Sequence, residues 1–260
     1  MKQTLILRQK EIRNYKDGLN LNSKYWQDWK KKLPPISSEL REIAIGMILP
    51  CVAIRRWCDA CMYKKSKHSL IKFEQGYTQE KFLNHLFSKF KSYCFMEEPG
   101  KRIELYGERK GLIKSLWFKT FSHYSFDDIW NLFYIENKDK YKVIKTIQKG
   151  LILNQLTDKG LAYWVMGDGS LQKDKKTMIL HTQSFNENEN LILSKELNKK
   201  FNFKTEVKLH KKFYWVIKFY KDDALILHNL IKPHITFGWR YMHLWHINYL
   251  SLKNKLKIFN

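Results

Sequence analysis

The chain has 260 residues, which is enough for one large domain or two small ones. It carries 48 Lys and Arg against 25 Asp and Glu, a formal net charge of +23 at pH 7, and 44% of its residues are hydrophobic. That apolar content excludes a disordered polycation. The longest near-continuous apolar run, residues 43–54, contains Pro50 and is shorter than the about 18–20 residues of a membrane span. Because a polyanion relieves the self-repulsion of such a charge, we expect nucleic acid rather than a membrane as the partner, the alternative being a solvated basic surface.

The predicted elements of the first half follow a basic arm, residues 1–36, which contains a helix at 23–32 and ends at Pro34-Pro35. A helix from about Ser38 to Leu49 should be buried, because it is apolar nearly all round. The spacing of Phe82, Leu86 and Phe90 predicts an amphipathic helix over 79–91. Strands are expected at 52–57, 69–74, 102–106 and 111–114, and a helix at 126–134.

The second half repeats this order. Thr157 is expected to cap a helix over 158–167. A strand at 177–183, a helix at 187–201, strands at 205–209 and 213–220 and a helix at 222–231 follow. The series helix, hairpin, helix, hairpin, helix thus occurs twice, as an internal duplication of roughly 110 residues. We expect an α+β protein with the N-terminal arm and two halves, residues 37–148 and 149–260.

One apolar segment in each half carries a recognisable motif. Residues 161–170, LAYWVMGDGS, followed by 180–185, LHTQSF, resemble the second motif of the single-chain form of LAGLIDADG homing endonucleases and maturases. Residues 43–54, IAIGMILPCVAI, resemble the first motif, and the likeness covers about residues 38–250. It implies a monomer with a pseudo-two-fold duplicated fold, in which two antiparallel saddle-shaped sheets are joined at two central helices.

The resemblance also implies a metal site at the ends of the two motif helices. In the family one acid from each helix binds Mg²⁺, which activates water and stabilises the leaving oxygen. Here Asp168 is the acid of the second motif, but Pro50-Cys51 stands where the first acid is expected. A thiol is mostly neutral at pH 7 and is a soft ligand, poorly matched to Mg²⁺. We therefore expect weakened Mg²⁺ binding, through Asp168 alone, and impaired cleavage; otherwise Asp168 is a helix-to-turn residue before Gly169.

Further site residues are implied by the same resemblance. Gln75 and Gln183 precede corresponding helices, and Lys142 matches the basic residue of the first site. The matching position in the second half is Met242, two residues after Arg240. Basic residues at hairpin tips and beside the groove are expected to contact phosphates rather than only solvent: Lys64, Lys65, Lys67, Lys208, Lys211, Lys212 and Arg240.

The cysteines and histidines raise two further questions, namely whether the chain has a zinc site and whether any histidine is catalytic. Cys51, Cys58, Cys61 and His68 have spacings that zinc sites use. We favour a hairpin cysteine pair in a reducing compartment and expect no zinc, because the family implies none. His181 and His210 are expected to face nucleic acid or solvent rather than to act as catalysts.

Two functions follow from these observations. The first is a binding protein for structured RNA that has lost cleavage, as an intron maturase or an organellar rRNA or ribosome component in a ribonucleoprotein. The second is a Mg²⁺-dependent, site-specific DNA homing endonuclease or nickase acting on duplex DNA, so enzymatic activity is left open. The frequent Lys, Asn, Ile, Phe and Tyr favour an AT-rich genome, which suggests an organelle-encoded, mitochondrial chain or a low-GC bacterium.

Overall fold

The computed structural model describes residues 23–50, 60–64, 67–137, 142–174, 176–210 and 212–235. The chain divides into two compact units, Met1–Lys145 and Thr146–Asn260. The domain limits expected from the sequence, after residues 36 and 148, stay predictions. None of the described helices is long and apolar enough to cross a bilayer.

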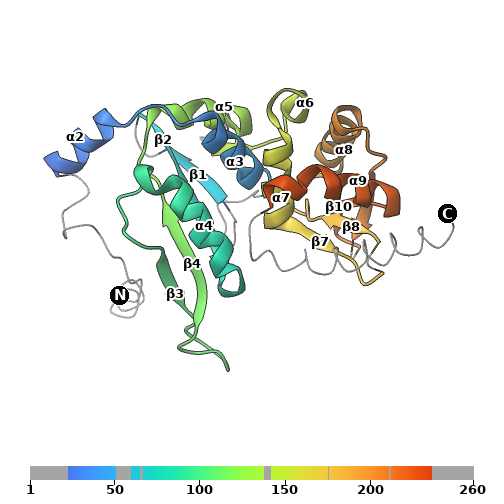
Figure 1. Cartoon of the computed structure of the whole chain (residues 1–260), viewed down its shortest axis with the longest axis horizontal. Coiled ribbons are helices and arrows are strands. Elements are labelled where there is room, and N and C mark those ends of the chain that lie inside the picture. Colours follow the sequence, from blue (N-terminus) through green and yellow to red (C-terminus); the bar gives the residue numbers. More distant parts are fainter. Residues whose placement is uncertain are drawn as a thin grey trace. The chain divides into compact units, whose positions relative to one another are not determined.

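The first described element of the first unit is the short helix α2 (Lys24–Lys32), as the sequence predicted (Figure 1). Ser23 accepts a hydrogen bond from the Trp26 amide, the usual arrangement of an N-cap. Trp26 is buried, and its ring centroid lies 5.4 Å from that of Phe121. Tertiary packing of one aromatic side chain thus holds this helix against the first unit.

From the predicted strand at 69–74 onward, the order of elements expected in the first unit is confirmed, as is the helix before it. Helix α3 (Ser38–Ile48) begins at Ser37, whose hydroxyl accepts from the Leu40 amide, and residues 43–48 are all buried. Four strands form one antiparallel sheet in the order β1-β2-β4-β3. The other elements are β1 (Ala60–Lys64), β2 (Ser69–Gly76), α4 (Glu80–Phe90), β3 (Gly100–Ile103), β4 (Ile113–Lys119) and α5 (Asp127–Phe133).

Helix α4 covers one face of this sheet (Figure 1). Phe73 of β2 lies 4.9 Å from Phe90 of α4 and 4.7 Å from Phe118 of β4, measured between ring centroids. Burial of each such ring contributes about 1.5–3 kcal/mol. Because side chains alternate along a strand, Lys72, Glu74 and Trp117 lie on the opposite face.

The second unit repeats the topology. Helix α7 (Asp158–Asp168) begins at Thr157, whose hydroxyl accepts from the Gly160 amide at 3.1 Å, as predicted. Its sheet has the order β7-β8-β10-β9, which matches β1-β2-β4-β3 strand for strand. The duplication expected from the sequence is thus confirmed in the topology. The elements are β7 (Gly169–Leu171), β8 (Met178–Leu180), α8 (Glu187–Phe201), β9 (Glu206–His210), β10 (Tyr214–Phe219) and α9 (Lys221–Ile231).

Some expected boundaries were wrong. The strand predicted over 177–183 spans only β8, and the strands predicted at 102–106 and 111–114 are β3 and β4. Gly107 and Gly111 have φ values of +73° and +89°, so the turn that joins these two strands occupies part of both predicted ranges. The predicted strand over 52–57 lies outside the described residues.

Strands β1 and β7 and the three elements described next were not among the predicted elements. Strands β5 (Tyr134–Asn137) and β6 (Lys142–Lys145) pair as a separate hairpin, and the five-residue helix α6 (Leu151–Gln155) opens the second unit. The α6 backbone is held by two side chains of α8: Glu196 accepts from the amides of Ile152 and Leu153, and Lys200 donates to their carbonyls. A helix that depends on such contacts has no pattern of its own in the sequence.

Candidate nucleic-acid interface

The carbonyl end of α3 is closed by a lysine. Lys145, the last residue of β6, donates to the carbonyl oxygens of Ile48 and, at 3.3 Å, of Leu49. Its side chain lies over the ring of Phe133, 5.3 Å from the centroid, and the residue is only 9% exposed. The last carbonyls of a helix lack partners within the helix and carry partial negative charge, so an ammonium group is favourable there. Sequence reasoning missed this residue and named Lys142, which starts the same strand and whose side chain lies outside the described part.

The corresponding end of α7 carries the predicted acid. Asp168 is the last residue of the helix and is half-buried, and its carbonyl oxygen accepts from the His181 amide at 3.0 Å. The chain turns directly into β7 at Gly169, where a Cβ atom would lie 2.5 Å from the Val165 carbonyl oxygen. The turn therefore requires glycine, and it fixes the position of Asp168.

The donor sets at the two helix ends differ in their fit to Mg²⁺. Carboxylate and carbonyl oxygens are the hard ligands that this cation takes, so the end of α7 fits one. At the end of α3, an ammonium group occupies the carbonyl oxygens and Pro50 follows, which does not fit a cation. Cys51 lies outside the described residues, and its pairing with Asp168 stays a prediction.

A charged cluster lies on the face of the first sheet opposite α4. The carboxylate of Glu74, 7% exposed, accepts from the Ser115 hydroxyl at 2.6 Å and forms ion pairs with Lys72 and, at 2.8 Å, with Arg102. Both cations also lie over the ring of Trp117, at 5.9 and 5.8 Å from its centroid. The cluster holds two cations in place on the sheet, which suits contacts to phosphates or base edges. The alternation of Lys72 and Glu74 along β2 was a signal that could have found it.

The same face of the second sheet carries polar groups as well. Glu206 of β9 pairs with Lys208 at 2.7 Å and accepts from the Tyr220 hydroxyl at 3.2 Å. These hydrogen bonds lower the pKa of Glu206 below its usual value. His181 shares hydrogen bonds with the Ser170 hydroxyl at 2.7 Å and with the Gln183 amide at 3.3 Å. His181 is thus a half-buried member of a polar set next to the end of α7.

The two glutamines lie in different surroundings. Gln75 is 4% exposed, and the register of β2 places it on the face that carries Phe73 and α4. Gln183 is exposed and lies beyond the end of β8. That these two glutamines belong to the site stays a prediction.

Of the basic residues expected at hairpin tips, Lys64, Lys67 and Lys212 lie in or beside a turn, whereas Lys208 lies within β9. Lys64 ends β1 and Lys67 precedes β2, and both are exposed. Lys208 is exposed on β9, and Lys212 lies in the β9–β10 turn with a φ of +62°. Phosphate contact by these residues stays a prediction. Lys65, Lys211 and Arg240 lie outside the described residues.

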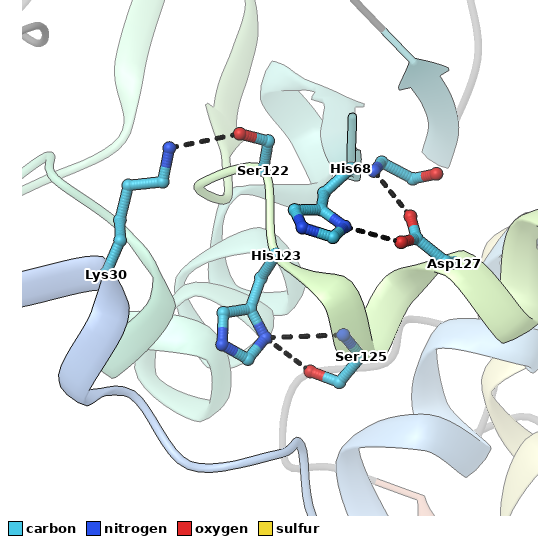
Figure 2. Close-up of polar contacts among 7 residues, drawn as sticks. Lys30, His68, Ser122, His123, Ser125 and Asp127 are labelled. Carbon is cyan, nitrogen blue, oxygen red and sulfur yellow. Dashed lines mark hydrogen bonds and ion pairs between the residues drawn. The ribbon is translucent and has the colours of Figure 1, made fainter. Parts of the chain in front are cut away.

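A set of hydrogen bonds joins the start of β2, next to the β1–β2 turn, to the start of α5. His68 hydrogen-bonds to one carboxylate oxygen of Asp127 at 2.7 Å, as can be followed in Figure 2. The Ser69 amide donates to the other oxygen, also at 2.7 Å. Burial would raise the pKa of Asp127, but these hydrogen bonds outweigh it and the pKa is lowered. Beside them His123 bonds to Ser125, and burial lowers the pKa of His123. These contacts attach the tip to the start of α5.

The sequence raised the hypothesis that Cys51, Cys58, Cys61 and His68 bind zinc, against which we expected a hairpin cysteine pair. In the structure the Cys61 thiol hydrogen-bonds to the Tyr63 hydroxyl at 3.3 Å, and burial raises the pKa of Cys61. Within the part of the chain that the structure describes, no three Cys, His, Asp or Glu residues are grouped so as to hold a metal ion. Cys51 and Cys58 lie outside that part.

The chain contains two copies of one helix-and-hairpin unit, each with cations on one face of its sheet, which is the duplicated arrangement expected for a nucleic-acid-binding protein of the homing-endonuclease fold. Residues 41–227 match the family described as the LAGLIDADG DNA endonuclease family. The chain belongs to this family.

Relatives and a solved structure agree with this assignment. The chain is 31% identical over 245 residues to the "Probable intron-encoded endonuclease 1" of Wickerhamomyces canadensis, covering 92% of this chain and 99% of the relative. It is 28% identical over 234 residues to the "Cytochrome b mRNA maturase bI2" of Saccharomyces cerevisiae, covering 88% of this chain and 53% of that one. The homing endonuclease I-WcaI bound to its DNA recognition sequence matches with 32% identity and a TM-score of 0.73, over 86% of this chain and 94% of that structure.

Proposed function

We propose that this chain is a LAGLIDADG protein that binds structured RNA and is impaired in DNA cleavage, and that it acts as an intron maturase or within an organellar ribonucleoprotein. The observation that carries the proposal is the lysine at the end of α3. Lys145 donates to the carbonyls of Ile48 and Leu49, directly before Pro50-Cys51. The end of α3 thus has an ammonium group on its carbonyl oxygens and is followed by Pro50-Cys51, which supplies no acid for a metal ion.

The second half keeps its acid, which limits the chemistry that remains. Mg²⁺ supplies, when bound, Lewis-acid polarisation of a phosphoryl oxygen. Asp168 provides one carboxylate for such an ion, at a position set by Gly169. Without a second acid we expect at most weak nicking of one strand.

Charge and relatives support a nucleic-acid partner. The formal net charge is +23, and one relative is named as an mRNA maturase. An RNA duplex has a deep and narrow major groove, so we expect recognition through phosphates, 2′-hydroxyl groups and stacked bases. An intron-encoded origin in a mitochondrion is the localisation that we propose with this function.

A cleavage assay beside an RNA-crosslinking experiment tests the proposal. The purified full chain is incubated with supercoiled plasmid and with long host DNA in Mg²⁺ or Mn²⁺, and RNA crosslinked in host cells is sequenced. We expect no double-strand cuts, weak nicking that Asp168→Asn removes, and one recovered structured RNA whose binding Asp168→Asn leaves unchanged. Clean double-strand cuts at a single site that depend on Asp168 would refute it.

A second candidate is a site-specific DNA endonuclease or nickase. The likeness to I-WcaI bound to DNA, at 32% identity and a TM-score of 0.73, favours it. The triple variant Pro50→Gly, Cys51→Asp, Lys145→Gln discriminates, because it restores an acid and releases the carbonyl oxygens of α3. If the groove accepts DNA, this variant should gain Mg²⁺-dependent cleavage over the Pro50→Gly, Cys51→Asp variant. If this variant binds no duplex DNA, the second candidate is refuted.

A further inference from the structure

The equivalent hairpins of the two units end in exposed aromatic rings. Tyr106, in the β3–β4 turn, is 74% exposed, and Phe213, in the β9–β10 turn, is 79% exposed. No other large hydrophobic side chain in the described part of the chain is as exposed as these two. The turns have different sequences, YGERKGL and HKKFY, so each places its ring at the tip independently.

Each of the two turns also carries exposed apolar and cationic side chains. In the first unit Leu112 is exposed, and the Arg109 guanidinium lies 4.4 Å from the centroid of the Tyr77 ring. Lys110 is exposed beside them, and Glu108 is the acid of this turn.

The tip of the second unit has the same composition. Leu209 and Tyr214 are exposed, the Tyr214 ring lies 6.4 Å from that of Phe213, and the exposed Lys212 precedes it. Both tips thus combine aromatic surface with positive charge, which is the chemistry that binds unpaired nucleotides.

The turns are ordered by their own hydrogen bonds. The Gly111 amide donates to the Glu104 carbonyl at 2.8 Å, and the Lys110 amide donates to the Gly107 carbonyl at 3.1 Å. In the second unit the Phe213 amide donates to the His210 carbonyl at 3.2 Å. The rings are therefore presented on fixed backbones, which lowers the ordering cost of binding a base.

We propose that Tyr106 and Phe213 stack on unpaired bases in loops or bulges of a structured RNA. This inference rests on the proposed function and adds the part of the RNA that is bound. Faces of paired bases are covered by their neighbours in a duplex, whereas RNA loops offer unstacked bases that proteins bind on aromatic rings. Arg109 over Tyr77 adds a cation–π platform, and Lys212 lies next to the second ring for phosphate contact.

The test compares Tyr106→Ala, Phe213→Ala and their double variant with the wild-type full chain. Leu225→Ala is the matched control, because Leu225 is an exposed apolar residue of α9 and is not part of either turn. Phe213→Trp is the conservative variant. The probes are an RNA hairpin with 2-aminopurine in an unpaired loop, a DNA hairpin of the same sequence, and a fully paired DNA duplex.

We expect each alanine variant to weaken binding of the RNA hairpin on the order of tenfold, since stacking on a ring contributes on that scale per base. The quenching of 2-aminopurine fluorescence should fall together with the affinity for the RNA hairpin. Phe213→Trp should retain both the affinity and the quenching. Leu225→Ala should bind the RNA hairpin as the wild type does, and binding of the paired duplex should be the same in all variants. Equal losses on the DNA hairpin would overturn the assignment to RNA. Unchanged RNA binding by the double variant would overturn the stacking and indicate a protein contact at the tips. Failure of the wild-type chain to bind any RNA would instead refute the proposed function.

Discussion

Replacing Lys145 by methionine tests the cation at the end of α3. The ammonium group donates to two buried carbonyls, and a hydrogen bond to a charged group contributes about 1.5–3 kcal/mol. Two such bonds give a gross loss of about 3–6 kcal/mol. Burying the ammonium group costs several kcal/mol, and Lys145→Met recovers part of that cost. We expect a net loss of about 2 kcal/mol in the free energy of unfolding.

The measurement is unfolding in urea followed by circular dichroism, with melting as a second readout. A loss of about 2 kcal/mol lowers the melting temperature by roughly 4–8 °C for a chain of this size. Lys89→Met is the control, because Lys89 pairs with Glu39 at 2.9 Å in a partly exposed position, where a pair contributes under about 1 kcal/mol. If Lys145→Met destabilises the chain no more than Lys89→Met does, the ammonium group does not hold the end of α3.

Three further substitutions test local features of the fold. Gly169→Ala should lower the free energy of unfolding in urea by about 1–3 kcal/mol, because the new Cβ would lie 2.5 Å from the Val165 carbonyl oxygen. Gly76→Ala is the control and should lower it less, because a Cβ there would have no atom within 4 Å. Equal losses in the two variants would contradict this expectation. Glu196→Ala should lower the free energy of unfolding by about 3 kcal/mol, since it removes the buried acceptor of the Gly150, Ile152 and Leu153 amides. Glu187→Ala, at an exposed position of the same helix, is the control. If hydrogen exchange at α6 stays slow in Glu196→Ala, the Glu196 carboxylate does not hold this helix in place. Burial, together with the charges of His68 and Lys30, lowers the pKa of His123 against the opposing effects of the Leu33 carbonyl and Asp127. The unfolded chain therefore binds more protons than the folded chain, and the stability of the fold falls as the pH drops below 6.5. His123→Gln should make the melting temperature depend less on pH in that range, and an unchanged dependence would contradict this role of His123.

The helices with local signals were predicted closely from the sequence. Thr157 and the apolar residues after it predicted α7, and the range 187–201 predicted α8. Caps and side-chain periodicity act between residues a few positions apart, so they can be recognised without knowledge of the fold. The same holds for the duplicated order of elements, because it is a succession of such local patterns.

Elements held by distant partners were missed. Helix α6 depends on Glu196 and Lys200 of α8, and the β5–β6 hairpin brings Lys145 to the end of α3. The partners in these contacts are more than forty residues apart. A short helix or hairpin of this kind is stable only after its partner has folded beside it.

The sequence by itself determined the charge, the paired motifs, the acid at Asp168 and the absence of an acid at Cys51. The tertiary structure decided which lysine donates hydrogen bonds to the last carbonyls of α3. It also decided on which face of the sheet each residue of β2 lies. It buried Gln75 against α4 and turned Glu74 toward the open face with Lys72 and Arg102. The reason is physical: strand register and helix capping by remote side chains are set by pairing between distant segments, and a shift of one residue in register exchanges the two faces of a sheet.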